Sequence, residues 1–291
     1  MILAVAAAAA QSLRFALQKV LASATLGPAA ATWSRFFWSA PIAILGMAVY
    51  LGATGQAFPR LGPSFWAYGV AGGVFQILAT ICTVALFKRR AFAVGITFKK
   101  TEVMLTAMAG LVILGDVISS FGAMAIALGF AGVLLLSDPP EGGGVFNRGA
   151  ALGLLSGFFF ALSAVTYRGA TLSISDADIV ATAGITLAIV TTLQSLLLAT
   201  WLYFREPGQI TETIMNWRTS SLVGLFSMLG SFAWFAAFSI QNAAYVFAVG
   251  QVEPIFSLII GRLAFLETPS PRELWGMLLL TISILAIVIA G

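Results

Sequence analysis

Residues 243–264 read AAYVFAVGQVEPIFSLIIGRLA, an apolar run long enough to cross a bilayer, with Glu253 and Pro254 near its middle. An ionisable group at that depth costs roughly 2.5–3.5 kcal/mol on insertion scales, so a chain keeps one chiefly where it faces a cavity or a partner. Pro254 has no N–H, and its ring collides with the carbonyl of Gly250, which leaves that oxygen without its helical partner. We therefore expect a broken membrane helix here, with a functional site at its centre.

A second run carries charge near its middle. Residues 91–114 read AFAVGITFKKTEVMLTAMAGLVIL and contain Lys99, Lys100 and Glu102. Broken helices and buried charge at the midplane in both halves of a chain are typical of the substrate sites of transporters. The two runs together predict such a site.

The composition excludes a soluble globular protein, since 60% of the residues are hydrophobic, 9% are charged and the mean hydropathy is +1.00. A crossing takes about 20 apolar residues, so the chain has room for about ten spans with short connections. We predict an all-α polytopic membrane protein. Its ten transmembrane helices are expected at residues 2–24, 29–51, 64–87, 91–114, 118–137, 147–169, 178–204, 218–239, 243–264 and 272–290.

Residue types that the sequence lacks exclude several kinds of chemistry. The chain has no histidine, which excludes HExxH zinc proteases and serine–histidine catalysis. Cys82 is the single cysteine, so neither an intrachain disulfide nor a cysteine metal site is available. The net charge of +4 is scattered along the chain, which suits membrane anchoring rather than nucleic-acid binding. We expect a protein that is not an enzyme, with no cofactor, no metal and no nucleic-acid partner.

The two halves of the chain repeat short segments in the same order. Residues 15–17 (FAL) recur as 160–162, and residues 92–95 (FAVG) recur as 247–250. Matches in a fixed order indicate an internal duplication.

The duplication divides the chain into five spans in residues 1–140 and five in residues 145–291. Between them lies a proline- and glycine-rich linker, DPPEGGG, at residues 138–144. An odd number of spans reverses the orientation of the chain. We therefore expect two inverted five-helix repeats around a central cavity, which is the arrangement that alternating access requires.

Polar side chains of the first span fall on one face. Gln11, Arg14 and Gln18 follow one another at i, i+3 and i+7, and Phe15 lies on the adjoining stripe. Polar groups on a membrane helix turn away from lipid. We expect Gln11, Arg14 and Phe15 to form one wall of a substrate cavity. For Lys19, closer to the helix end, snorkelling to the interface is an equal alternative.

The charges of the central runs need partners. Lys99 and Glu102 are three residues apart and can neutralise one another, either as a structural ion pair or as part of the site. Glu253 has no cation within a turn of its own helix, where Gln251 is its polar neighbour. Its partner must come from another helix, and the candidates are Arg14, Lys99 and Lys100.

Two further features complete the predicted site. Trp234 lies deep in its span, where its ring can pack in the bundle or stack on an apolar or aromatic part of a substrate. Gly250 and Pro254 interrupt their helix and form the predicted hinge.

A set of landmarks now resembles the two repeats of the EamA-type drug/metabolite transporter superfamily. They are Pro28 followed by Arg35, the Glu253-Pro254 pair, Asp116 ahead of Gly122, and Glu267 ahead of Gly276. Within that superfamily the chain is most similar to the YddG-type amino-acid exporters. It departs from the family in its first helix, where the usual tryptophan-containing stretch reads AQSLRF at residues 10–15.

The resemblance implies a basket-like bundle in a bacterial inner membrane that exports small solutes. It also implies that both termini lie in the cytoplasm. The loop cations indicate the opposite orientation, because that arrangement leaves only Arg60 and Arg168 inside, against eight lysines and arginines outside. Both orientations stay open. The oligomeric state also stays open, with a monomer as one candidate.

The leading hypothesis is a secondary transporter that exports amino acids or similar zwitterionic metabolites. Arg14, Lys99 or Lys100 would bind the substrate carboxylate, and Glu253, Gln251 and the Gly250 carbonyl would bind its ammonium group. One alternative is an exporter of anionic metabolites such as sugar phosphates. Another is an integral membrane enzyme, which would need a nucleophile with a base although no histidine is available.

Overall fold

The computed structural model describes residues 2–89, 92–102, 104–105, 120–136, 148–175, 177–240, 246 and 250–290 of the chain. Within these ranges the secondary structure is helical and includes no β-strand, which confirms the predicted all-α class. Five of the described helices are long and apolar enough to cross a membrane: α2, α3, α7, α8 and α10. Their number and length fit a multi-pass membrane protein.

The first half of the chain forms helices close to the predicted spans. They are α1 (Ile2–Ala24), α2 (Pro28–Thr54), α3 (Pro63–Phe87), α4 (Phe92–Lys99) and α6 (Ser120–Leu136). Proline occupies the first position of α2 and α3, where its fixed φ suits a helix and its missing N–H has no partner to lose.

The second half continues with α7 (Arg148–Leu172), α8 (Ile179–Arg205), α9 (Gln209–Met215), α10 (Trp217–Ile240), a 3₁₀ turn η2 (Gly250–Val252), α12 (Glu253–Ala264) and α13 (Pro271–Ala290). The long helices begin and end within three residues of their predicted bounds. The short helix α9 was not predicted. The predicted spans 91–114 and 243–264 and the linker at 138–144 extend outside the described residues.

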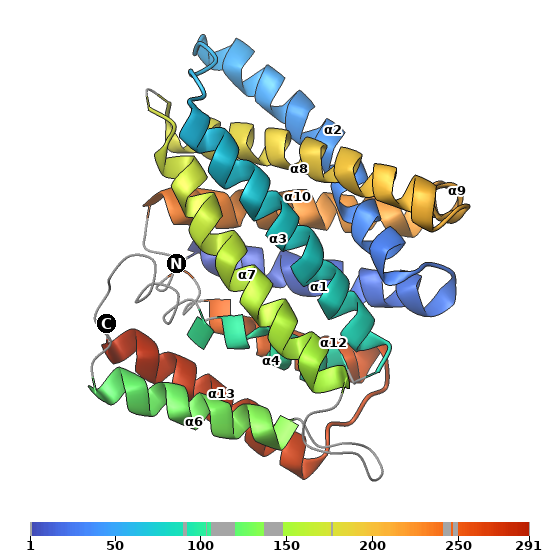
Figure 1. Ribbon diagram of the computed structural model, residues 1–291, viewed down its shortest axis with the longest axis vertical. Coiled ribbons are helices and arrows are strands. Elements are labelled where there is room, and N and C mark those ends of the chain that lie inside the picture. The colour runs from blue at the N-terminus through green and yellow to red at the C-terminus, as the bar shows by residue number, and fades with distance from the viewer. Residues whose placement is uncertain are drawn as a thin grey trace.

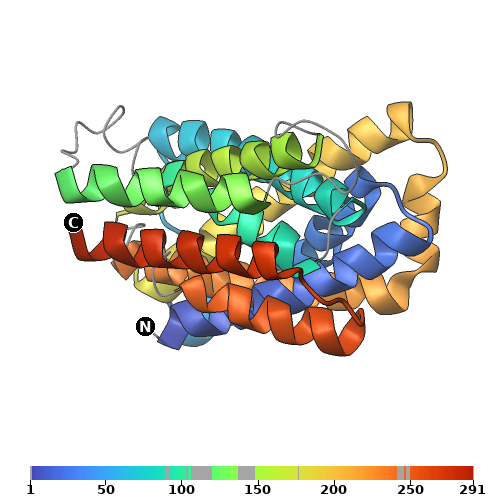
Figure 2. The same cartoon turned by 90° about the horizontal axis from the view of Figure 1, so that it is seen from below.

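The helices pack as pairs that surround two short central helices. α1 lies along α10, and α3 lies along α7 (Figure 1). α4 and α12 contact each other between these pairs, with α12 also against α1 and α4 against α7. α2 packs on α8 at one side of the molecule, and α6 packs on α13 at the opposite side (Figures 1 and 2).

Close approach of α7 to the central helix depends on glycine. A Cβ atom added at Gly157 would lie 2.0 Å from Thr101 Oγ1 and 2.9 Å from the backbone nitrogen of Glu102. One turn earlier, a Cβ atom at Gly153 would lie 2.7 Å from the ring of Phe98. The missing side chains therefore let α7 hold the charged segment 99–102 at the centre of the bundle.

Candidate functional site

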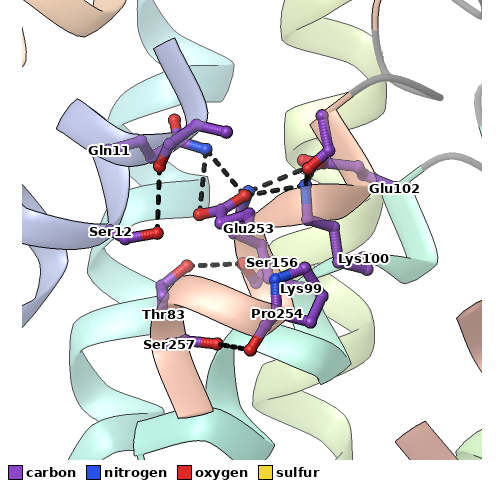
Figure 3. A network of polar contacts seen from close by, with 12 residues as sticks. Gln11, Ser12, Thr83, Lys99, Lys100, Glu102, Ser156, Glu253, Pro254 and Ser257 are labelled. Atoms are coloured by element: carbon purple, nitrogen blue, oxygen red, sulfur yellow. Dashed lines mark hydrogen bonds and ion pairs between the residues drawn. The ribbon is translucent and has the colours of Figure 1, made fainter. Parts of the chain in front are cut away.

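A cluster of buried charges lies where α4 meets α12 (Figure 3). Glu253, the first residue of α12, is fully buried, and its Oε2 lies 2.7 Å from Lys100 Nζ and 3.2 Å from Lys99 Nζ. Lys99 Nζ also lies 3.2 Å from Glu102 Oε1. Burial of a charge is tolerable when opposite charges and hydrogen bonds compensate it, and this cluster supplies both.

The broken helix contributes its backbone to the same cluster. Lys100 Nζ donates a hydrogen bond to the Gly250 carbonyl at 3.1 Å. This is the oxygen that Pro254 deprives of a helical N–H partner. The structure therefore gives the freed acceptor to a lysine of the first half of the chain.

α1 contributes a chain of amide contacts to the cluster. Gln11 Nε2 donates to both carboxylate oxygens of Glu253 at 3.1 Å. Gln11 Oε1 accepts from Arg14 Nη2 at 3.4 Å, and Arg14 Nη1 donates to Gln18 Oε1 at 2.9 Å. The Arg14 guanidinium lies 3.8 Å from the centre of the Phe15 ring. The polar face predicted for the first span thus points into the bundle.

A cavity lies beside the charged cluster. Its volume is about 40 Å³, which is room for roughly three water molecules. Gln11, Lys99 and Glu102 line one side of it. Five of the remaining lining residues are polar or charged: Arg35, Gln76, Ser163, Tyr167 and Ser231. The other five are apolar: Phe160, Ala164, Trp234, Phe235 and Phe238. A solute as large as an amino acid requires these side chains or helices to move apart.

Arg35, from the first third of α2, is held in the cavity wall by hydroxyl groups. Its Nε donates to Ser227 Oγ at 2.8 Å, its Nη1 to Thr80 Oγ1 at 3.0 Å and its Nη2 to Ser231 Oγ at 3.2 Å. Its side chain is 3% exposed. Among the described residues, no carboxylate forms an ion pair with it.

Tyr167, Gln76 and Gln194 form a neutral network next to Arg35. The Tyr167 hydroxyl donates to Gln76 Oε1 at 3.0 Å and accepts from Gln194 Nε2 at 3.2 Å. Trp234 stacks on Phe238, with ring centroids 5.9 Å apart, and its ring leaves no room for a Cβ atom at Gly250. The cavity therefore has a polar wall and an aromatic wall.

A separate ion pair lies at the end of the bundle near the C-terminus of α1. Lys19 pairs with Glu267, whose Oε2 accepts the backbone N–H of Phe92 at 2.6 Å. Phe92 in turn contacts the rings of Phe87 and Phe265, at centroid distances of 5.1 and 5.4 Å. Glu267 thus binds the first residue of α4. Lys19 contacts Glu267 and the Phe265 ring, whereas the sequence offered either the cavity wall or the membrane interface for it.

The structure brings most of the predicted site residues together. Gln11, Lys99, Glu102 and Trp234 line the cavity, and Glu253 lies directly behind Gln11 and Lys99. Of the three candidate partners of Glu253, Lys99 and Lys100 pair with it, and Arg14 bonds to amides. Arg14 and Phe15 are not among the described cavity-lining residues, and the Gln251 side chain and Asp116 lie outside the described part of the chain.

Sequence reasoning missed the placement of Arg35, Tyr167 and Gln76 in the cavity wall. Arg35 served only as a landmark of the resemblance, although a lone arginine in an apolar span is itself a signal of a site. Among the described residues, no group of histidine, cysteine and carboxylate side chains could hold a metal ion.

Comparison with known proteins supports the class that this geometry indicates. Residues 147–289 match the EamA-like transporter family, so the second half of the chain resembles a family of membrane transporters of small molecules rather than of enzymes. A solved structure, described only as a crystal structure of a protein, has a TM-score of 0.65 at 15% sequence identity. The match covers 98% of this chain and 97% of that chain, so the two share a fold. No curated protein matches the sequence.

Proposed function

We propose that this protein is a secondary-active transporter that exports amino acids or similar zwitterionic metabolites across a bacterial inner membrane by alternating access. The observation that carries the proposal is a cavity whose wall combines cationic, anionic and aromatic side chains and draws on both halves of the chain. A zwitterion needs a cation for its carboxylate and a carboxylate for its ammonium group, and the cavity offers Arg35, Lys99 and Glu102.

The packing of the helices supports the inverted repeat. A two-fold relation between the halves pairs α1 with α7, α2 with α8, α3 with α10, α4 with α12 and α6 with α13. Under this relation the α1–α10 contact maps onto the α7–α3 contact, while the α2–α8, α4–α12 and α6–α13 contacts map onto themselves. All of these contacts are present. Two halves related in this way have two equivalent packings, which is what alternating access uses.

The closed end of the bundle supports the same mechanism. We infer that the Lys19–Glu267 pair and the phenylalanines around it close the substrate path at the C-terminal end of α1. Opening this end requires that α1 separates from the start of α4 and the end of α12. We expect the opposite end to close as this one opens.

Flux through purified protein in liposomes tests the proposal. A panel of radiolabelled amino acids, sugar phosphates and cationic dyes should give counterflow of amino acids only. The absence of flux for every member of the panel would contradict a transporter function, and flux of dyes alone would contradict the substrate class.

The excess of buried cations favours an exporter of anionic metabolites as the second candidate. Arg14 and Arg35 have no ion-pairing carboxylate among the described residues, whereas Lys99 and Lys100 have two. Sugar phosphates in the same panel distinguish this candidate, because a phosphate exporter would carry them in preference to neutral zwitterions.

A further inference from the structure

Within the described residues, Arg35 is a buried charge that its neighbours hydrogen-bond but do not neutralise. The three groups that hold it, Thr80, Ser227 and Ser231, are neutral hydroxyls. A lone cation in the interior of a membrane protein is unfavourable unless an anionic group binds to it or water solvates it. Because Arg35 lines the cavity, a solute in the cavity can supply that counter-charge.

The guanidinium keeps donors for such a solute. Arginine has five N–H donors, one on Nε and two on each Nη. The hydroxyl contacts use one donor on each of the three nitrogens. One N–H therefore remains on Nη1 and one on Nη2, which leaves two donors for the oxygens of a carboxylate.

The other buried cations of the described structure are already engaged. Lys99 and Lys100 are paired with Glu102 and Glu253. Arg14 is hydrogen-bonded to two glutamine side chains, lies over the Phe15 ring and is not among the cavity-lining residues. Lysine ammonium groups that hold two carboxylates can bind a third only by giving one up, whereas Arg35 needs no exchange of partners.

We propose that Arg35 is the residue that binds the carboxylate of the substrate and so restricts the transporter to solutes that carry one. The inference rests on the proposed function and deepens it, because it assigns to Arg35 the role that the sequence pattern gave to Arg14, Lys99 or Lys100. Tyr167 and Gln76 line the cavity beside it and offer neutral hydrogen-bonding groups, while Trp234 and Phe235 face the apolar part of the solute. Glu102, also in the wall, accepts the ammonium group.

The test compares an acid with its amide in proteoliposomes. Leucine and leucinamide share their apolar part and differ in the carboxylate, as do phenylalanine and phenylalaninamide. Wild-type protein should prefer each acid by roughly ten- to a hundredfold in kcat/KM, which is the range that a charged hydrogen-bonded contact provides. In Arg35→Gln this preference should fall to about one, with amide flux retained. Arg35→Lys keeps the charge but lacks the guanidinium, and its preference should be intermediate.

Arg14→Gln is the matched control, since it removes the guanidinium of a neighbouring buried arginine that is not among the cavity-lining residues. It should retain the acid preference of the wild type, whatever its overall rate. Persistence of the preference in Arg35→Gln, or its loss in Arg14→Gln alone, would overturn the assignment. A different outcome would contradict the proposed function itself: wild-type protein that transports neither the acids nor the amides.

A chemical measurement covers the case in which the Arg35 variants do not fold. Phenylglyoxal modifies arginine side chains, and peptide mass spectrometry identifies the modified positions. Leucine should protect Arg35 of the wild-type protein and leucinamide should not. Equal protection by the two compounds, or protection of Arg14 instead of Arg35, would contradict the proposal.

Discussion

At the scale of single residues, the centre of the molecule shows charges that satisfy one another across the two halves of the chain. Pro254 frees the Gly250 carbonyl, and Lys100 binds both that oxygen and Glu253. The sequence alone shows that Glu253 needs a cation from another helix. It cannot choose among Arg14, Lys99 and Lys100, because that choice depends on how α1, α4 and α12 pack.

The first prediction concerns the charge of Glu253. In Glu253→Gln, Lys99 and Lys100 lose one of their two carboxylates, so we expect a loss of about 3–5 kcal/mol in the free energy of unfolding. Transport should fall strongly. The double variant with Lys100→Met should recover much of the stability, because it removes one uncompensated charge, but it should not recover transport. Thermal unfolding in detergent and flux in liposomes measure the two effects.

Glu273→Gln is the control, since Glu273 lies at the start of α13, outside the charged cluster, and glutamine keeps an acceptor for the Ser270 N–H. It should change the free energy of unfolding and the transport flux by only a small amount. If the double variant regained normal flux along with its stability, Glu253 would have a structural role only.

At the scale of helices, prolines at helix starts and close contacts at glycines account for much of how the helices begin and pack. Proline at the first position predicts where α2 and α3 begin, and apolar length predicts where the long helices end. The helix α9 escaped prediction because its seven residues are too few for a periodic pattern. The closeness of α7 to residues 99–102 could not be predicted either, since it depends on which helix faces Gly157.

Gly157→Ala tests that contact. The added methyl group would collide with Thr101 and approach the backbone of Glu102, so α4 and α7 must separate. We expect a loss of about 1–3 kcal/mol in stability, as for other overpacked cores, together with reduced transport. Gly46→Ala in α2 is the control, because a Cβ atom there meets nothing within 4 Å and alanine favours a helix. Equal stability of the two variants would rule out the close contact.

Asp178 gives a prediction about pH. Its carboxylate precedes α8 and accepts the backbone N–H of Ala181 at 2.7 Å, the Gln56 amide at 2.7 Å and the Tyr50 hydroxyl at 2.6 Å. The Ala181 N–H is the main cause that lowers the pKa of Asp178 to about 2. Because this pKa lies below the unfolded value of about 3.9, the stabilisation is present above pH ~4 and is lost as the pH falls through about 2.

Asp178→Ala should therefore lower the stability at pH 7 by about 1 kcal/mol, the usual effect of losing an N-cap. Asp178→Asn keeps an acceptor at the cap and should retain most of that stability, while the dependence on pH between 4 and 2 becomes weaker. Thermal unfolding curves across this pH range provide the measurement. An unchanged pH dependence in Asp178→Asn would show that other groups cause it.

At the scale of the whole molecule, the sequence predicts the helical class, most of the span boundaries and the charged centre. It does not predict the closed end, because Lys19, Phe92 and Glu267 are distant in the chain and meet only in the folded bundle. The same reason hides Arg35, whose hydroxyl partners come from α3 and α10.

Cross-linking tests whether the closed end must open during transport. In a background with Cys82→Ser, which removes the single native cysteine, Lys19→Cys and Glu267→Cys should be bridged by a short bifunctional thiol reagent. Transport should stop when the bridge forms and resume when a cleavable bridge is reduced. Each single-cysteine variant, treated in the same way, should keep its activity. Undiminished flux through the bridged protein would mean that this end stays closed throughout the cycle.

The pairing of α4 with α12 also bears on how the protein is made. Lys99 leaves the ribosome 154 residues before Glu253, so the first half of the chain meets the bilayer while Lys100 still lacks its nearest carboxylate. A lysine at the centre of a lone helix opposes insertion by about 2.5–3.5 kcal/mol. We therefore expect the segment around α4 to wait at the membrane surface and to enter fully only when the segment of α12 arrives. A nascent chain truncated before residue 250 should leave its α4 segment accessible to water-soluble labels, whereas the full-length chain should protect it.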